Sequence, residues 1–172
     1  MTHRPAISPL AYALGPSSLG LVLVAHRDHA VAAVLLGDHP AALLGELADR
    51  FPDATPISGD GASAALLAAI VALIESPRAP ADLPLAPAGT PFQRSVWAAL
   101  RQIPAGSTVT YTELAARLGS PRSVRAVAGA CAANPCAVVV PCHRVVRADG
   151  GLAGYRWGVE RKDALIKREA GQ

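Results

Sequence analysis

Val138-Val-Val-Pro-Cys-His-Arg-Val-Val146 is the most informative stretch of the chain, because it places a thiol, an imidazole and a guanidinium side by side. We expect its apolar first part, 137–140, to be a short buried strand with Cys142 at its end. Cationic neighbours lower the pKa of a thiol and raise its thiolate fraction, as a nucleophile requires. The stretch therefore predicts a nucleophilic cysteine, to be weighed against the commoner case of a buried structural one.

The composition is that of a globular protein of one average domain or two small ones. Of the 172 residues, 51% are hydrophobic and 17% are charged, so the chain can bury a core. Prolines and glycines interrupt the uncharged stretch 5–25, and the apolar run 64–74 is too short to cross a bilayer. The start of the sequence does not have the pattern of a signal peptide. Cys131, Cys136 and Cys142 are too clustered for a disulfide framework, which indicates a reducing, cytoplasmic setting.

Charge is distributed unevenly along the chain. Residues 1–90 carry four Arg/Lys against eight Asp/Glu, whereas residues 91–172 carry twelve against five. A basic half predicts contact with a polyanion, and arginine, which dominates here, suits phosphate. The alternative is a basic face that only meets solvent.

The first half predicts an N-terminal α/β lobe, with a small antiparallel sheet and helices. Apolar runs at 19–25 and 30–36 flank a turn and predict a hairpin buried on both faces. Helical spacing predicts helices over 40–51 and 63–75, the second apolar on all sides and therefore buried. The proline-rich stretch 76–89 indicates a connector with a short edge strand near 83–85. We place the domain boundary here, which gives domains 1–89 and 90–172.

The second half predicts a mainly helical lobe. Helices are expected from Thr90 and Pro91 to about 103, from Thr110 to Leu118, from Ser120 and Pro121 to about 133, and over 158–169, with a hairpin turn at 149–151. The second and third of these are short and are joined at Gly119, which resembles a winged-helix-like helix-turn-helix.

The last predicted helix places two charged side chains on its inward face. Lys162 and Glu169 share a stripe with Leu165 by i, i+3, i+4 spacing. A buried carboxylate needs a partner, so we expect a relay in which Glu169 orients His143 and His143 activates Cys142. The alternative is that charges near a frayed terminus face solvent.

The helix expected after Pro121 has features of a groove-binding helix. Arg122 and Arg125 lie on one face, and Ala126 and Gly129 are small enough for close approach to another surface. The helix carries few side chains that read base edges, which favours sequence-independent DNA binding. The alternative is an alanine-rich packing helix.

Further motifs surround the Cys-His pair. Pro141-Cys-His-Arg-Val-Val146 is preceded by Tyr111, Arg125-Ala-Val and Asn134-Pro, and followed by Gly154-Tyr-Arg-Trp-Gly158, Lys162 and Glu169. Together these residues resemble the O6-alkylguanine-DNA alkyltransferases, most closely the alkyltransferase module of the bacterial adaptive-response protein. The resemblance covers about 90–169 and continues more loosely into 19–52.

The resemblance implies direct reversal of DNA damage. Such a protein binds duplex DNA in the minor groove without regard to sequence, flips out the O6-alkylguanine, and moves the alkyl group onto its own cysteine once. O4-alkylthymine is a further candidate substrate. The implied catalytic residues are Cys142 as acceptor, His143 as base, Glu169 as its orienter, Asn134 as hinge, and Tyr111 and Lys162 beside the reacting pair. The implied DNA-binding residues are Arg125 as the finger that fills the stack, with Tyr111, Arg122, Ala126 and Gly129. The implied pocket residues are Tyr155, Val145, Arg156, Trp157 and Cys131.

The resemblance also implies that no cofactor is needed, and we expect a monomer without membrane contact. Some family members bind zinc through N-terminal cysteines, but every cysteine here follows residue 130, and His3, His26, His29 and His39 alone do not predict a zinc site. We expect Cys136 to be structural and no transcription-activating module to be present. Three alternatives remain: a non-catalytic alkyl-lesion sensor, a thiol hydrolase, and a helix-turn-helix regulator. The presence of Cys142 argues against the first, and no oxyanion hole or dimer helix is evident for the others.

Overall fold

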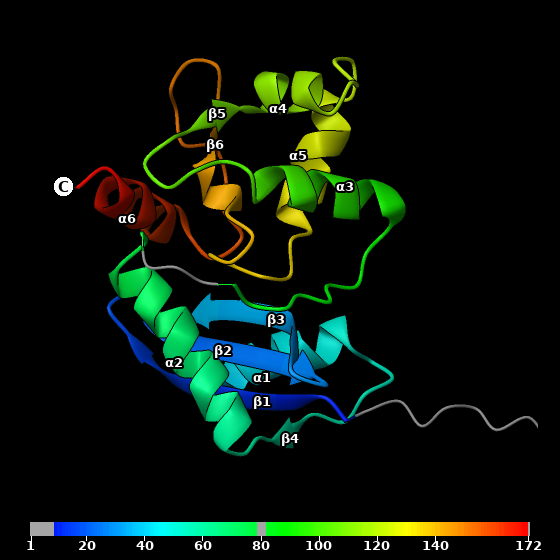
Figure 1. The fold of residues 1–172 in the computed structure, drawn as a ribbon, viewed down its shortest axis with the longest axis vertical. Coiled ribbons are helices and arrows are strands. Elements are labelled where there is room, and N and C mark those ends of the chain that lie inside the picture. Colours follow the sequence, from blue (N-terminus) through cyan, green and yellow to red (C-terminus); the bar gives the residue numbers. More distant parts are fainter. Residues whose placement is uncertain (1–8, 79–81, 172) are drawn as a thin grey trace, which may run out of the picture.

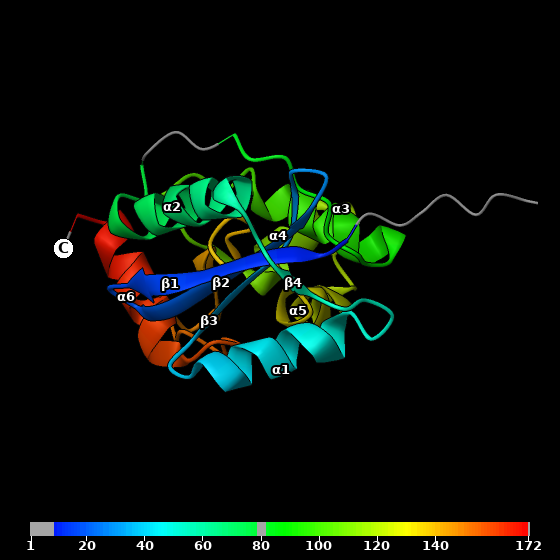
Figure 2. The ribbon, with the colours of Figure 1, turned by 90° about the horizontal axis from the view of Figure 1, so that it is seen from below.

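The computed structural model describes residues 9–78 and 82–171, so His3, the start of the chain and the connector residues 79–81 lie outside it. Its N-terminal lobe is a sheet with strand order β3-β2-β1-β4. Strands β1 (Ala11–Ser17), β2 (Gly20–Arg27) and β3 (Ala30–Gly37) are antiparallel, and β4 (Ile57–Ser58) runs parallel to β1. Helices α1 (Pro40–Arg50) and α2 (Gly61–Glu75) lie on opposite sides of the strands (Figures 1 and 2).

The predicted hairpin is confirmed as β2 and β3. Its two-residue turn places Asp28 and His29 at φ 47° and 66°, the left-handed conformation that tight hairpins need. Sequence analysis missed β1, because Gly15 and Pro16 suggested a break in the chain. Proline is tolerated there because Pro16 pairs with Leu21 at the end of the strand, beside the turn into β2.

Helix α2 is confirmed, but the prediction that it is buried all round is wrong. Only Ser63, Ile70 and Ile74 are buried within it, and the helix covers β1 and β2 from outside. Many of its other residues are alanines, whose small side chains expose little apolar area to water. High mean hydropathy therefore did not require a central position for this helix.

Helices and short strands make up the described part of the C-terminal lobe. They are α3 (Pro91–Leu100), β5 (Val109–Thr110), α4 (Tyr111–Arg117), α5 (Val124–Ala132), β6 (Val145–Val146) and α6 (Val159–Glu169), with the 3-10 turn η1 (Cys142–Arg144) before β6. The predicted capping box of α4 is present, since Thr110 and Glu113 exchange hydrogen bonds with each other's backbone N–H groups. Helices α4 and α5 pack against each other after a turn at Gly119, whose φ is +70°.

Helix α5 begins later than predicted. Residues 120–123 form a turn in which the Ser123 N–H donates to the Ser120 carbonyl at 2.9 Å, and Ser123 precedes the first helical residue. Arg122 therefore lies in the turn, and the prediction that it shares a helix face with Arg125 is wrong. Pro121 opens a turn here rather than a helix, a position that its fixed φ also suits.

The predicted strand over 137–140 is absent. Cys136 forms a single bridge to Val34 of β3, after which the chain curls with Val138 at φ 69°. The Val140 N–H returns to the Cys136 carbonyl at 3.0 Å. Cys142 consequently starts η1 rather than ending a strand. The turn at 149–151 forms as expected, but the strand after Arg144, β6, pairs with β5 in parallel instead of forming a hairpin.

The C-terminal lobe sits on the β3 edge of the sheet (Figure 1). Val34 donates to the Pro135 carbonyl at 2.9 Å and accepts from the Ala137 N–H at 3.0 Å. The predicted edge strand near 83–85 is a single bridge between Leu85 and Val31 on the same edge. One hydrophobic cluster runs through both lobes. No helix in the described ranges is both long and apolar enough to traverse a bilayer.

Candidate functional site

Cys142 lies at the junction of the curled segment 137–140 and β6. Its side chain is buried, 6% exposed, and lines a cavity of about 440 Å³. The cavity is lined by Tyr111, Ala128, Cys131, Ala132, Cys142, Arg147, Ala153, Gly154, Tyr155 and Arg156. A ligand that entered this cavity would therefore meet the thiol.

Asn134 connects the end of α5 to Cys142. Its buried Nδ2 donates to the Val140 carbonyl at 2.8 Å and to Cys142 Sγ at 3.2 Å, while Oδ1 accepts from the Cys136 N–H at 2.9 Å. One side chain thus satisfies the Val140 carbonyl and the Cys136 N–H of the curled backbone. This arrangement explains why an Asn-Pro pair follows α5: proline stops the helix and the amide organises the turn.

Burial raises the pKa of the Cys142 thiol, although the bond from Asn134 and the charge of Lys162 oppose that shift. The expectation of a lowered pKa is therefore wrong in direction. The reason is that Cys142 is nearly inaccessible to water, and the adjacent guanidinium of Arg144 pairs elsewhere. The resting side chain is a neutral thiol that needs a base.

His143 and Glu169 supply that base and its support. His143 Nε2 lies 2.7 Å from Glu169 Oε1, and both side chains are buried. Arg144 binds the same carboxylate through two nitrogens, at 3.0 Å to Oε2 and 2.8 Å to Oε1. Together the bonds from His143 and Arg144 outweigh the effect of burial and lower the pKa of Glu169 to about 2.

An ionised Glu169 only accepts hydrogen bonds, so Nε2 of His143 carries the proton between them. Burial lowers the pKa of His143, which keeps the ring neutral and leaves Nδ1 as an acceptor. Nδ1 is buried and has no hydrogen-bond partner in the part of the chain that the structure describes. The ring therefore has a free lone pair beside the residue that carries the thiol.

Sequence analysis missed Arg144 as a member of this cluster. In a third contact, Nη1 of Arg144 donates to the Ile103 carbonyl at 2.5 Å, so this arginine links Glu169 of α6 to the loop that follows α3. The signal was available, because a carboxylate placed on a buried face beside Cys-His-Arg has two candidate cations, and only the imidazole was considered.

Lys162 is buried as predicted, with no exposed surface. Nζ donates to the Val145 carbonyl at 2.7 Å and to the Gly154 carbonyl at 3.4 Å, and burial lowers its pKa. The lysine thus links β6 to the loop that forms one wall of the cavity.

The predicted pocket residues divide into two groups. Cys131, Tyr155 and Arg156 line the cavity, whereas Val145 is fully buried and does not line it. Tyr111, predicted as a catalytic and DNA-binding residue, lines the cavity as well. Trp157 does not line the cavity; its ring meets that of Tyr155 edge-on, with centroids 5.3 Å apart. The remaining lining residues, Ala128, Ala132, Arg147, Ala153 and Gly154, were not predicted, because loop packing brings them together.

Four of the five residues predicted to meet DNA are exposed, and the fifth, Tyr111, is half-buried at the cavity. Arg125, Ala126 and Gly129 lie on the outer side of α5, and Arg122 lies in the turn before it. A Cβ added to Gly129 would touch nothing within 4 Å. The open side of α5 therefore has room for close approach of another molecule.

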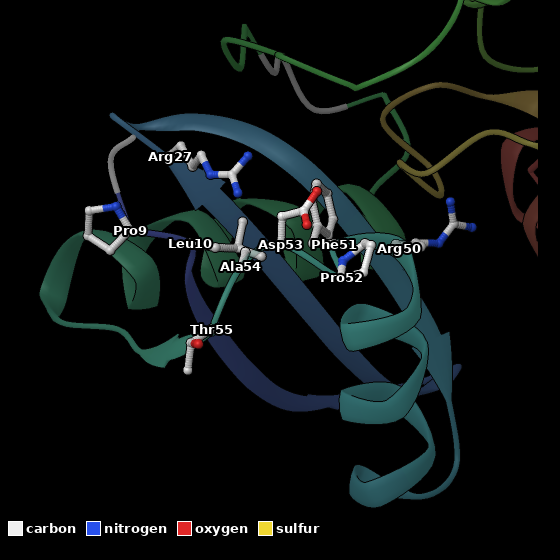
Figure 3. A pocket seen from close by; sticks show the side chains of 9 residues that line it. All are labelled: Pro9, Leu10, Arg27, Arg50, Phe51, Pro52, Asp53, Ala54 and Thr55. Atoms are coloured by element: carbon white, nitrogen blue, oxygen red, sulfur yellow. The ribbon is translucent and has the colours of Figure 1, made fainter. Parts of the chain in front are cut away.

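A second hollow, of about 390 Å³, lies in the N-terminal lobe (Figure 3). It is lined by Pro9, Leu10, Arg27, Arg50, Phe51, Pro52, Asp53, Ala54 and Thr55. Its Arg27 guanidinium sits 5.5 Å from the centroid of the Phe51 ring. This lining contains no thiol or imidazole, so the candidate nucleophile Cys142 does not belong to it. Across 9–78 and 82–171 no three His, Cys, Asp or Glu side chains come together to hold a metal.

A sheet lobe packs against a helical lobe, and the buried thiol of Cys142 lines a cavity and is followed in the chain by the imidazole of the buried His143–Glu169 pair. This arrangement fits the class of proteins that react through a cysteine. Residues 91–171 match the family model for the DNA-binding domain of 6-O-methylguanine DNA methyltransferase. The chain is 32% identical to Mycobacterium tuberculosis OGT, solved in complex with DNA, with a TM-score of 0.79 over 94% of this chain and 93% of that one. The chain belongs to the O6-alkylguanine-DNA alkyltransferase family.

Two curated relatives are similar over shorter parts of their length. The bifunctional transcriptional activator/DNA repair enzyme Ada of Escherichia coli is 49% identical over 159 residues, 92% of this chain and 45% of Ada. The methylated-DNA–protein-cysteine methyltransferase of Methanosarcina barkeri is 53% identical over 88 residues, 51% of this chain and 56% of that protein. The chain thus matches about half the length of these relatives.

Proposed function

We propose that this chain repairs alkylated DNA by transferring the alkyl group of O6-alkylguanine to Cys142. The observation that carries the proposal is the order of contacts around one cavity: an ionised Glu169 holds a neutral His143, and Cys142 lines the cavity wall. Family membership supplies the substrate class. The related OGT was solved with DNA, and the relatives named above are DNA repair and methylated-DNA methyltransferase proteins.

The reaction is a displacement at the alkyl carbon. His143 takes the thiol proton at Nδ1, directly or through a water, and Sγ of Cys142 attacks the carbon opposite O6. The S–C bond forms as the C–O6 bond breaks, and the electron pair of the broken bond stays on the guanine. The positive charge of the protonated His143 compensates the negative charge that this leaves on the base. Because a thioether does not readily revert, each molecule acts once and no cofactor is needed.

The raised pKa of Cys142 fits this scheme. A permanent thiolate in a buried cavity would carry a large desolvation cost, whereas a thiol that ionises only when the substrate and base are aligned avoids it. Glu169 contributes by stabilising the imidazolium that forms transiently. Asn134 stabilises the developing thiolate through its 3.2 Å bond to Sγ. Lys162 and Tyr111 lie at the border of the same site.

Duplex DNA is the proposed partner, bound in the minor groove by the outer side of α5 and without sequence preference. Support comes from the exposed Arg125, Ala126 and Gly129 and from the basic second half of the chain. Arg125 is proposed to fill the gap left by the flipped guanine, and Tyr111 to contact the adjacent phosphate and base. We further propose a monomer in the cytoplasm, where the three free thiols would stay reduced.

The finger role of Arg125 gives a differential prediction. Arg125→Ala should slow repair of an O6-methylguanine duplex about tenfold or more, and should leave reaction with the free base nearly unchanged, because only the duplex requires extrusion. Arg122→Ala is the matched control, since it removes an exposed arginine three residues away in the preceding turn. We expect it to weaken duplex affinity without lowering the rate at saturating DNA. Single-turnover kinetics measure both, and equal losses with duplex and free base would remove the finger role.

The function itself is tested by intact-protein mass spectrometry after incubation with an O6-methylguanine duplex. We expect a gain of one methyl mass that stops at one equivalent, and peptide mapping should place the methyl on Cys142 rather than on Cys131 or Cys136. No gain in mass together with preferential binding of the lesion would support a non-catalytic sensor instead. The absence of both methyl uptake and preferential lesion binding would overturn the assignment to alkyl repair.

A further inference from the structure

The segment 151–158 supplies one wall of the active cavity, which is the cavity that Cys142 lines. The segment contains no helix or strand. Gly154, Tyr155 and Arg156 line the cavity from this segment. Ala153 has a φ of 60° and Gly158 a φ of 103°, so the chain turns sharply at both ends of the wall. Such a segment needs fixed contacts to hold a single conformation.

The two aromatic side chains of the wall supply no polar contact. Tyr155 Oη and Trp157 Nε1 are buried and have no hydrogen-bond partner within the described ranges. Backbone contacts exist at Gly154, which accepts from Lys162 Nζ at 3.4 Å, and at Trp157, whose carbonyl accepts from Arg161 at 2.8 Å. Between these two positions lies Arg156.

The Arg156 side chain is held from the other lobe. Its Nε donates to Glu46 Oε1 at 2.8 Å, across 110 residues of sequence. The same oxygen accepts from Nε and Nη2 of Arg50, both at 3.3 Å. Arg50 points away from the other side chains of the N-terminal hollow (Figure 3). Glu46 thus binds two guanidinium groups that would otherwise repel each other. Burial first, and then the charge of Arg156, lower the pKa of Arg50, and Glu46 opposes that shift.

Helix α1 is a rigid support for this carboxylate. Leu43 and Leu47 of α1 are buried in the core, with exposed fractions of 2% and 0%, and the helix packs on β3. Glu46 lies one residue before Leu47, so its backbone position is set by the sheet lobe. The contact therefore links the cavity wall to the most regular part of the N-terminal lobe.

We propose that Glu46 is a positioning residue for the transfer reaction: by holding Arg156 it fixes the wall of the cavity against which the alkylated base must be oriented. This inference rests on the proposed function. It assigns the N-terminal lobe a part in the reaction, although every residue that touches the cavity comes from the C-terminal lobe.

The test is a charge reversal and a charge swap, measured by single-turnover methyl transfer over a range of duplex concentrations. Glu46→Arg places three like charges together and should lower the maximal rate at saturating duplex about tenfold, with duplex affinity unchanged or tighter. Glu46→Gln, which only removes a partly exposed ion pair, should lower it about threefold. Combining Glu46→Arg with Arg156→Glu re-forms a pair of opposite charges and should return amide exchange in 151–158 to that of the unmodified protein.

Asp38→Arg is the matched control. It removes the 2.7 Å ion pair between Asp38 and Arg161, which also joins the two lobes, while Arg161 keeps its bonds to the carbonyls of Leu19 and Trp157. We expect a maximal rate within about twofold of the unmodified protein, a change in the range of an exposed ion pair. An equal loss in Asp38→Arg and Glu46→Arg, or no recovery of amide exchange in the charge swap, would overturn the positioning role.

Amide hydrogen exchange provides a readout that does not depend on activity. Glu46→Arg should accelerate exchange in the peptide covering 151–158, where Gly158 donates to the Tyr155 carbonyl, and should leave exchange in β2 unchanged. Unchanged exchange in 151–158 would contradict the inference even if the rate fell. If the unmodified protein transfers no methyl group, the proposed function fails, and the exchange data still decide whether Glu46 holds the wall.

Discussion

The protein with Cys142→Ala is expected to take up no methyl group from an O6-methylguanine duplex, whereas the unmodified protein takes up one equivalent. The other two thiols are poor substitutes. Burial raises the pKa of Cys131 and of Cys136 to about 12 each, whereas Cys142 directly precedes His143 and its Sγ accepts from Asn134 Nδ2. Intact-protein mass spectrometry measures the uptake. Lesion binding and the thermal unfolding transition should both be retained, because Asn134 keeps its 2.8 Å bond to the Val140 carbonyl.

Cys136→Ala is the matched control for this experiment. Cys136 is fully buried beside β3 and does not line the active cavity, so its replacement should preserve uptake of one methyl equivalent. Methylation of the Cys142→Ala protein at Cys131, which does line the cavity, would contradict the assignment of one acceptor.

Glu169→Gln is expected to slow methyl transfer about a hundredfold, within the range that loss of general-base support produces. Glutamine is similar in size and can still accept from His143, but it cannot stabilise an imidazolium or neutralise Arg144. The measurement is the single-turnover rate at saturating duplex. Glu160→Gln is the control, since Glu160 is an exposed carboxylate on the same helix.

The same variant has a predicted effect on acid stability. Glu169 has a folded-state pKa of about 2 against an ordinary value of 4.5, so the unfolded state binds the proton first as pH falls. The stabilisation is complete above pH 4.5 and disappears as pH falls towards 2. Denaturant unfolding should show a steeper loss of the free energy of unfolding in that window for the unmodified protein than for Glu169→Gln. Parallel curves would show that the carboxylate is not held as the structure indicates.

Much of the fold was predictable because turns, helix caps and amphipathic patterns depend on residues that are close in the sequence. The hairpin of β2 and β3, the helix that begins at Pro91 and the capping box at Thr110 were all predicted and confirmed. Each depends on interactions within a few residues: apolar runs around a turn, or a side chain that caps the helix it precedes. The pairing of Glu169 with His143 was also predictable, because helical periodicity placed a carboxylate on a buried face.

The failures share a different cause. The segment 137–140 has the composition of a strand, yet its pairing with β3 ends after the bridge at Cys136 and the Ala137 N–H. Beyond that point the chain curls, and Asn134 binds the Cys136 N–H and the Val140 carbonyl at the two ends of the curl. The start of α5 was placed too early because a turn and a helix N-terminus use the same Ser-Pro chemistry. The pKa of Cys142 was predicted in the wrong direction because the adjacent arginine in sequence is committed to Glu169 in space.

The chemistry of this protein could therefore be predicted from its sequence. The Cys-His pair follows from adjacent residues, the buried glutamate from helical spacing, and the basic half from the count of charged residues. The tertiary structure alone decided the environment of that chemistry. Burial in the folded protein raises the pKa of the Cys142 thiol. The fold also brings Arg144 to Glu169 as a second cation, and it places Glu46 of α1 against Arg156 of the cavity wall. The physical reason is that burial and ion pairing depend on which distant surfaces meet, and those contacts leave no periodic pattern in the chain.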